Sequence, residues 1–181
     1  MTQVQHLRRR LARLAAPARL STLGPDEFEG YASVFGVADG AGDVVAPGAF
    51  ARSLKKRPPW RVRMLYQHFA HEPIGVWEAM VEDARGLYVK GRVIAGVQRG
   101  REVMALIGEG ALDGLSIGFR TRRAARDPAT GHRILQDLEL WEVSVVTFPL
   151  SQQSHVTAVG AKRAALAAHI HQATRQIANS R

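Results

Sequence analysis

The segment GALDGLSIGF, at residues 110–119, decides how the fold is read. In its second half the apolar residues Leu115, Ile117 and Phe119 alternate with polar or small ones, of which Ser116 is the first. Side chains of a strand point alternately to its two faces, so this pattern predicts a strand with one apolar face. Ser116 is then expected to point the other way, toward a polar surface or a cleft.

Two glycines flank this serine. Gly114 and Gly118 leave room for another backbone or a substrate chain to approach the strand closely. A serine presented in such a place is a candidate nucleophile. Surface serines are common, however, so an outward-facing strand serine without a chemical role is the alternative.

A helix is predicted immediately before this strand. Val103, Leu106 and Ile107 fall at the i, i+3 and i+4 positions, which form one apolar helix face. Gly108 and Gly110 follow as candidate C-terminal capping residues. The order is therefore helix, turn, strand, with the serine early in the strand.

Most of the remaining segments are typical of strands. The predicted strands span residues 28–36, 61–67, 74–81, 87–93, 138–148 and 156–159. The turns expected between them include residues 39–43, 82–86 and 124–131. A short helix is expected over residues 47–56. Together these elements predict a mainly β fold, a bent antiparallel sheet or barrel with peripheral helices.

The strand over residues 138–148 is the most apolar of the chain. Trp141, Val143, Val145 and Val146 place apolar side chains on both of its faces, which predicts a central strand covered on both sides. Glu142 interrupts this pattern. A carboxylate in an apolar strand costs free energy unless it has a partner.

The charge is concentrated at the two ends of the chain. The 25 Lys and Arg residues outnumber the 16 Asp and Glu residues, for a formal charge of +9. Residues 1–20 and 161–181 carry no acid, and residues 21–160 are formally neutral. We expect a basic N-terminal arm, a barrel domain and a basic, alanine-rich C-terminal helix over these three ranges. The arms either meet an acidic partner, protein or DNA, or only aid solubility, and a nucleic-acid-binding core is not expected.

Length and composition exclude several classes of protein. A chain of 181 residues can build one domain with a sizeable core. With no cysteine, neither a disulfide framework nor a thiolate metal site can form. No apolar run approaches the ~18 residues of a membrane-spanning helix, and no apolar signal core follows the basic N-terminus. A soluble, cytoplasmic protein is expected.

A serine needs a base to become a good nucleophile, and the base works best when a third group orients it. His68, at the end of the strand over residues 61–67 and in phase with its apolar face, is the candidate base, and Glu142 is the candidate orienting group. The alternatives are a hydrogen-bonded structural histidine and a glutamate at an edge or in an arginine salt bridge.

Two other interpretations of these motifs fit less well. The G-x-S-x-G pattern at residues 114–118 resembles a hydrolase elbow, but there the serine lies between a strand and a following helix, and here the helix comes first. His68 and His71 could suggest a metal site. Pro73 and the preceding strand argue against a helix there, and no other ligand cluster is evident.

Six sequence blocks resemble the tailed-phage prohead protease family, in that family's order. They are EGYASVF (29–35), DVVAPGAF (43–50), MLYQH (64–68), PIG (73–75), GALDGLSIGF (110–119) and WEVSVVTFP (141–149). The resemblance covers roughly residues 28–160. It implies a relation to the herpesvirus assembly proteases, with their barrel-plus-helices fold.

The resemblance also implies a function and a site. Members cleave segments of the scaffold and of the major capsid protein inside assembling procapsids, in the host cytoplasm. The nucleophile falls on Ser116, the base on His68 and the third member, an acid in phage relatives, on Glu142; Glu139, Asp43 and His155 are the other candidates for that third role. Whether the particle is a phage, a prophage or a domesticated gene transfer agent stays open, as does homo-oligomerisation.

Acyl transfer by these residues requires no cofactor, and neither a metal nor a membrane partner is implied. The oxyanion donors could be backbone N–H groups near Ser116 or the arginine-rich run at residues 120–123. The alternative function is a non-catalytic virion structural or scaffold-associated protein on the same barrel. The presence of Ser116, His68 and Glu142 argues against it.

Overall fold

The structure is a computed structural model, and it describes residues 23–160 of the chain. The predicted basic N-terminal arm and the basic C-terminal helix expected over residues 161–181 lie outside the described residues. The strands are β1 (Glu27–Val34), β2 (Asp43–Val45), β3 (Arg63–Tyr66), β4 (Pro73–Glu82), β5 (Gly86–Val93), β6 (Gly114–Arg126), β7 (Arg133–Val146) and β8 (Val156–Val159). The helices are α2 (Ala51–Lys56) and α3 (Gln98–Glu109), with a short 3-10 turn η1 (Pro59–Arg61).

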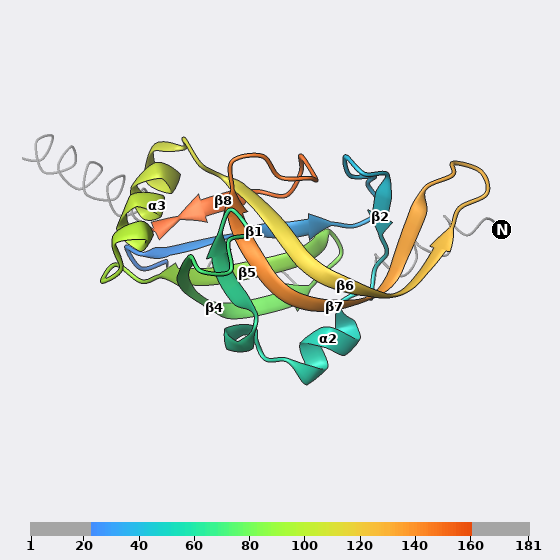
Figure 1. Cartoon of the computed structure of the whole chain (residues 1–181), viewed down its shortest axis with the longest axis horizontal. Coiled ribbons are helices and arrows are strands. Elements are labelled where there is room, and N and C mark those ends of the chain that lie inside the picture. The colour runs from blue at the N-terminus through green and yellow to red at the C-terminus, as the bar shows by residue number, and fades with distance from the viewer. Residues whose placement is uncertain (1–22, 161–181) are drawn as a thin grey trace, which may run out of the picture.

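The eight strands form one curled sheet in the order β2-β7-β3-β4-β5-β1-β8, with β6 paired to β7 (Figure 1). All neighbours are antiparallel except β2 and β3, which run parallel to β7. The two ends of the sheet meet where Gly114 bridges His155 and Leu115 N–H donates to Ser154 O over 2.9 Å. The predicted mainly β fold with peripheral helices is confirmed.

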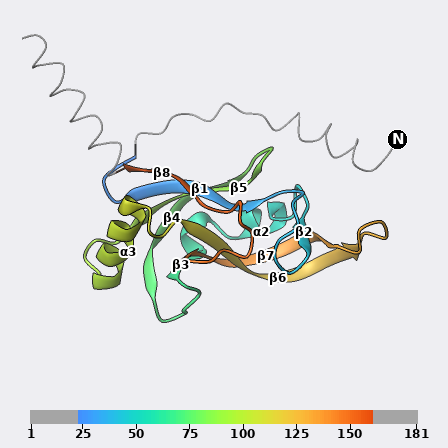
Figure 2. The same ribbon diagram turned by 90° about the horizontal axis from the view of Figure 1, so that it is seen from above.

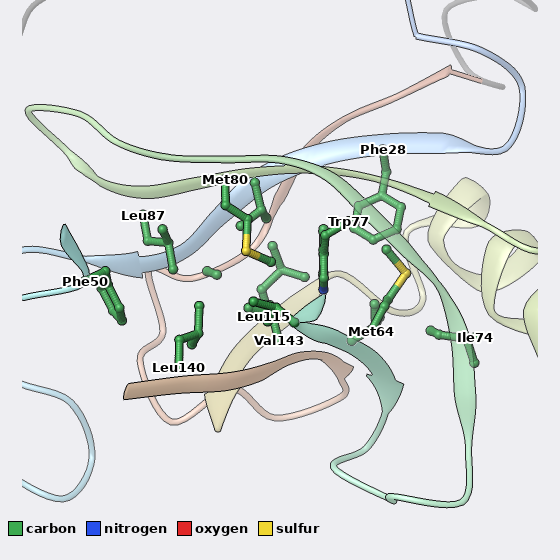
Figure 3. Packing of buried hydrophobic residues seen from close by; sticks show 14 of the residues in the cluster. Phe28, Phe50, Met64, Ile74, Trp77, Met80, Leu87, Leu115, Leu140 and Val143 are labelled. Carbon is green, nitrogen blue, oxygen red and sulfur yellow. The ribbon is translucent and has the colours of Figure 1, made fainter. Parts of the chain in front are cut away.

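The inner face of the curled sheet encloses the hydrophobic core (Figure 3). Trp77 is 1% exposed and meets Phe28 edge-on, with ring centroids 5.5 Å apart. From β6 and β7, Leu115 and Val143 reach into the same core and are fully buried. The alternation that predicted these strands therefore reflects one face turned to the core.

The β6–β7 hairpin is longer than predicted. Its strands run on to Arg126 and begin again at Arg133, well past the point where the apolar pattern stops. This end projects away from α3 in both views (Figures 1 and 2). Because its residues are mostly exposed, no alternation marks it in the sequence. The prediction that the apolar strand is covered on both faces is wrong at Trp141, which is 48% exposed.

The helix before the serine strand is confirmed, and it ends at Gly110, whose φ of 76° is left-handed. Glycine adopts this conformation without steric cost. The helix predicted from residue 47 begins only at Ala51. Gly48, with a φ of 87°, holds the preceding residues in a turn.

Helix α2 closes a gap along the edge of β7. Strands β2 and β3 pair with the two ends of β7, and between them α2 and the turn before it supply the hydrogen bonds. Leu140 N–H donates to Ser53 Oγ over 2.9 Å, and Leu138 N–H donates to Ala49 O over 2.9 Å. The helix thus lies against the middle of β7.

Among the helices described, none has the length and apolar character that crossing a membrane would require.

Candidate active site

Strand β7 presents two polar side chains on the outer face of the sheet. Val143 and Val145 are fully buried in the core, so Glu142 and Ser144 point the other way. Strand β6 continues this face, because Ser116 pairs with Ser144 and Gly118 pairs with Glu142. Residues directly opposite in an antiparallel pair share a face. Ser116 therefore projects outward, as the alternation predicted, and it is half-buried.

His68 reaches this face from a turn rather than from a strand. The chain leaves β3 at Tyr66, and Gln67 and His68 take left-handed φ angles of 51° and 61°. Such angles are uncommon outside glycine and cost free energy. The prediction that His68 continues the phase of the strand is therefore wrong. The two left-handed residues turn the chain and carry the imidazole over the outer face.

Hydrogen bonds hold this turn in place. Gln67 N–H donates to Val145 O over 2.9 Å, and the Gln67 side-chain amide donates to Thr147 Oγ1 over 2.6 Å. Across the base of the turn, Tyr66 N–H donates to Glu72 O over 3.0 Å. These contacts fix the turn to the C-terminal end of β7, which also carries Glu142.

The imidazole and the carboxylate meet directly. Nδ1 of His68 lies 2.6 Å from Oε1 of Glu142, and Ser144 Oγ donates to Oε2 of the same carboxylate. The Glu142 side chain is only 14% exposed, whereas that of His68 is 43% exposed. The carboxylate that interrupts the apolar strand thus has a partner on each oxygen, as the cost of its burial demands.

This contact changes the proton affinity of the ring. The hydrogen bond that Nδ1–H donates to Glu142 raises the pKa of His68 above its ordinary value of 6.5, partial burial of the ring opposes the shift, and the negative charge of Glu142 adds to it. A carboxylate at Nδ1 also fixes the tautomer, with the proton on Nδ1 in the neutral ring and Nε2 left as the basic nitrogen.

Gly118 makes room for the carboxylate. A Cβ atom placed there would lie 2.7 Å from both Cγ and Cδ of Glu142, closer than real contacts allow. The sequence suggested that another backbone or a substrate chain approaches this glycine. What approaches it is the Glu142 side chain, which lies across β6 beside the position of Ser116.

Ser116, His68 and Glu142 thus come together on one face. Ser116 is opposite Ser144, and Ser144 and His68 bind the two oxygens of Glu142. Within residues 23–160, no hydrogen bond joins Ser116 Oγ to the ring, and none reaches His68 Nε2. Catalytic hydrogen bonds are often long in a protein without substrate.

The other candidates for the third position are engaged elsewhere. Asp43 accepts a hydrogen bond from Arg133 Nε over 2.7 Å, and Glu139 pairs with Arg122. His155 lies beside Gly114, where the ends of the sheet meet. Of these carboxylates, Glu142 is the one in contact with His68.

The two rival interpretations find no support in the geometry. Ser116 lies within β6 with α3 before it, so the strand–serine–helix order of a hydrolase elbow is absent from this segment. In the part of the chain that the structure describes, no group of three or more His, Asp and Glu side chains is placed to hold a metal ion.

Sequence reasoning missed Ser144 and Gln67. Ser144 stands two residues after Glu142, so the alternation that turns Glu142 outward also places Ser144 beside it, and this signal could have been used. Gln67 has no comparable signal, because its role depends on a left-handed turn that no glycine marks.

The fold is shared with viral proteases. The structure of the bacteriophage T4 capsid assembly protease superposes with a TM-score of 0.55 at 17% identity, over 66% of this chain and 80% of that one. The protease of KSHV, solved with a hexapeptide phosphonate inhibitor, gives a TM-score of 0.53 at 12% identity, over 72% of this chain and 63% of that one.

The chain belongs to the caudovirus prohead serine protease family, whose profile matches residues 16–169. The prohead protease of Enterobacteria phage HK97 is 36% identical over 134 residues, 73% of this chain and 59% of that protein. The prohead protease of Escherichia phage T5 is 32% identical over 147 residues, 76% of this chain and 67% of that protein. The chain thus spans about three fifths of the length of the HK97 relative.

Proposed function

We propose that this protein is a serine endopeptidase that matures a phage-like head. The observation that carries the proposal is the 2.6 Å contact between His68 Nδ1 and Glu142 Oε1, on the strand face that also presents Ser116. Family membership supports the class of reaction. The roles of the three residues are inferred from their geometry and chemistry.

The reaction begins with Ser116. Its Oγ attacks the scissile carbonyl carbon while His68 Nε2 takes the hydroxyl proton. The carboxylate of Glu142 accepts the hydrogen bond from Nδ1–H and stabilises the imidazolium that forms. His68 then gives the proton to the leaving amine, the C–N bond breaks, and an acyl ester on Ser116 remains. Water, deprotonated by the same nitrogen, hydrolyses this ester and frees the serine.

The oxyanion requires donors that are already oriented. Strand N–H groups alternate in direction, and Leu115 N–H donates to Ser154 O, away from β7. Ile117 N–H, two residues on, points to the same side and is our first candidate. From the arginine-rich run at residues 120–123, Arg122 already pairs with Glu139, which makes it the weaker candidate.

The substrates proposed are polypeptide segments of the assembling head. Prohead proteases are the relatives of this chain, so we propose that it cleaves the major capsid protein and its scaffold segment inside procapsids in the host cell. The basic end segments, residues 1–20 and 161–181, are proposed to recruit the enzyme to acidic surfaces there.

Co-expression with the capsid protein of its own particle tests this function. The wild-type protein should convert the capsid precursor to a shorter form, and Ser116→Ala and His68→Ala should each leave it at full length, since loss of either costs several orders of magnitude in rate. Normal processing by Ser116→Ala would contradict the proposal. A precursor left intact by wild-type protein that still assembles with it would favour the non-catalytic alternative.

A further inference from the structure

A basic pocket lies beside the middle of β7, on the side closed by α2. Its volume is about 270 Å³. Five cationic side chains line it, together with Ser53, Leu138 and Glu139. The cations are Arg52, Lys56, Arg57, Arg61 and Arg122, which come from α2, the turn after it, η1 and β6. We call this site the basic pocket.

The positive charge of the basic pocket is only partly neutralised. Arg52 makes a two-pronged contact with Asp137, with N–O distances of 3.0 and 3.1 Å. Glu139 pairs with Arg122 and lies 3.8 Å from Arg57. Two carboxylates thus neutralise the charge of three arginines only in part.

The remaining two cations are open to an incoming ligand. Lys56 and Arg61 are exposed, and among the residues described neither forms an ion pair. The body of the protein is formally neutral, so this excess is a local feature and not part of a general basic surface.

The basic pocket shares a face with the candidate active site. Leu140 and Val143 are both fully buried although three residues apart, because the pairing of β7 with β6 shifts register between Leu140 and Glu142. This β-bulge places Glu139 and Glu142 both on the outer side of β7. They are three residues apart, which is about 10 Å along a strand. An extended polypeptide that passes the site would reach the basic pocket within about three residues.

We infer that the basic pocket binds an acidic segment of the polypeptide substrate, at a distance from the bond that is cut. This inference rests on the proposed endopeptidase function. Arginine and lysine bind carboxylates by charge-assisted hydrogen bonds, and five such side chains converge on this pocket. The site would select substrates by a negative charge and orient the chain across Ser116.

A carboxylate-bearing polypeptide fits this geometry better than nucleic acid does. A duplex presents a charge about every 1.7 Å along its axis and calls for a long stripe of cations. Here the cations converge on one concavity, and Glu139 lies inside it and would repel a continuous line of phosphates.

The test uses full-length protein carrying Ser116→Ala, so that binding is measured without hydrolysis. The probe is a fluorescent peptide of glutamates only, with a glutamine-only peptide and a short DNA duplex as comparisons. Lys56→Gln combined with Arg61→Gln removes the two cations that have no ion pair. Lys55→Gln combined with Arg101→Gln makes the same charge change at two exposed residues outside the basic pocket.

We expect the pocket pair of substitutions to weaken glutamate-peptide binding roughly tenfold at low salt, and the control pair to weaken it by less than about twofold. A photo-crosslinking version of the peptide should attach within residues 52–61 and near Arg122 in the protein with both cations present. Equal weakening by both pairs, crosslinks confined to the ends of the chain, or tighter binding of the duplex at this site would overturn the inference.

The two proposals can fail separately. If the glutamate peptide binds the basic pocket but wild-type protein leaves the capsid precursor intact, the pocket stands and the endopeptidase function fails. If wild-type protein cuts the precursor and the pocket substitutions change neither binding nor cleavage, the function stands and the pocket inference fails. Melting temperatures of both double variants, compared with the parent, check that the fold is intact.

Discussion

Two carboxylates on the outer face of β7 lie three residues apart and have different partners. Glu142 binds His68 and Ser144, and its side chain is 14% exposed. Glu139 pairs with Arg122, with Arg57 at 3.8 Å, and its side chain is 29% exposed. Glu139 and Glu142 thus share a strand, a face and a residue type, yet they belong to two sites of different chemistry.

The difference lies in whether the partner can release a proton. Arginine stays charged at any relevant pH, and the hydrogen bond from Arg122 keeps the pKa of Glu139 below the ordinary range. Histidine titrates near neutrality, and Glu142 raises the pKa of His68. One region of the face is therefore suited to binding and the other to proton transfer.

Of the substitutions that test the difference between the two carboxylates, Glu142→Gln should lower the rate of cleavage most. It removes the charge that stabilises the imidazolium and favours the wrong tautomer, and a change of this kind in a triad costs up to about ten-thousandfold in rate. Cleavage of the capsid precursor, followed in time, measures the loss. Glu78→Gln, an exposed carboxylate paired with Arg92, is the matched control and should keep the wild-type rate.

The same variant should also shift the pH dependence. His68 must be neutral to act as base, so the wild-type rate should rise with pH through a midpoint above 6.5. Without the carboxylate the midpoint should fall toward the ordinary value. A midpoint that is unchanged in Glu142→Gln would show that another group controls the reaction.

Gly118→Ala should have an intermediate effect. The new methyl group would occupy space now filled by Glu142 and push the carboxylate from His68, and a shift of about 1 Å at a catalytic group can cost roughly a hundredfold. Gly108→Ala, in α3 with nothing within 4 Å of the added atom, is the control. If Gly118→Ala retains full activity, the carboxylate does not need its present position.

The smallest effects should appear in stability, with opposite pH dependence at the two carboxylates. The folded-state pKa of Glu139 is depressed, so its contribution is present above the ordinary carboxyl pKa of 4.5 and is lost as pH falls. The folded-state pKa of His68 is raised, so its contribution is present below 6.5 and is lost as pH rises. The melting temperature of Glu139→Gln should therefore approach that of the parent as pH falls below 4.5, and that of Glu142→Gln should approach it as pH rises above 6.5. If the two variants differed from the parent by the same amount at every pH, the proposed difference between Glu139 and Glu142 would be contradicted.

The sequence predicted best what depends on alternation. The outward direction of Ser116 and the unusual position of Glu142 both follow from the period of two along β6 and β7, and the contact with His68 agrees with the need of a buried carboxylate for a partner. The fold class followed from the same pattern, because each strand turns one face to a single core.

What the sequence could not show depends on local backbone geometry or on exposure. The left-handed pair Gln67 and His68 carries no glycine to mark it, so the phase of His68 was predicted wrongly. Trp141 is apolar yet 48% exposed, because it lies at the register shift of β7 against β6, between the paired residues Leu140 and Glu142. The basic pocket joins cations from segments far apart in the chain, which no spacing reveals.

The most direct test of the account is covalent labelling by a fluorophosphonate, which reacts only with a serine activated by a base. Peptide mapping of the labelled wild-type protein should place the modification on Ser116. Ser116→Ala should not react, and His68→Ala should react at a small fraction of the wild-type rate. Absence of labelling in folded wild-type protein, or a label on any other serine, would contradict the claim that Ser116, His68 and Glu142 form one catalytic unit.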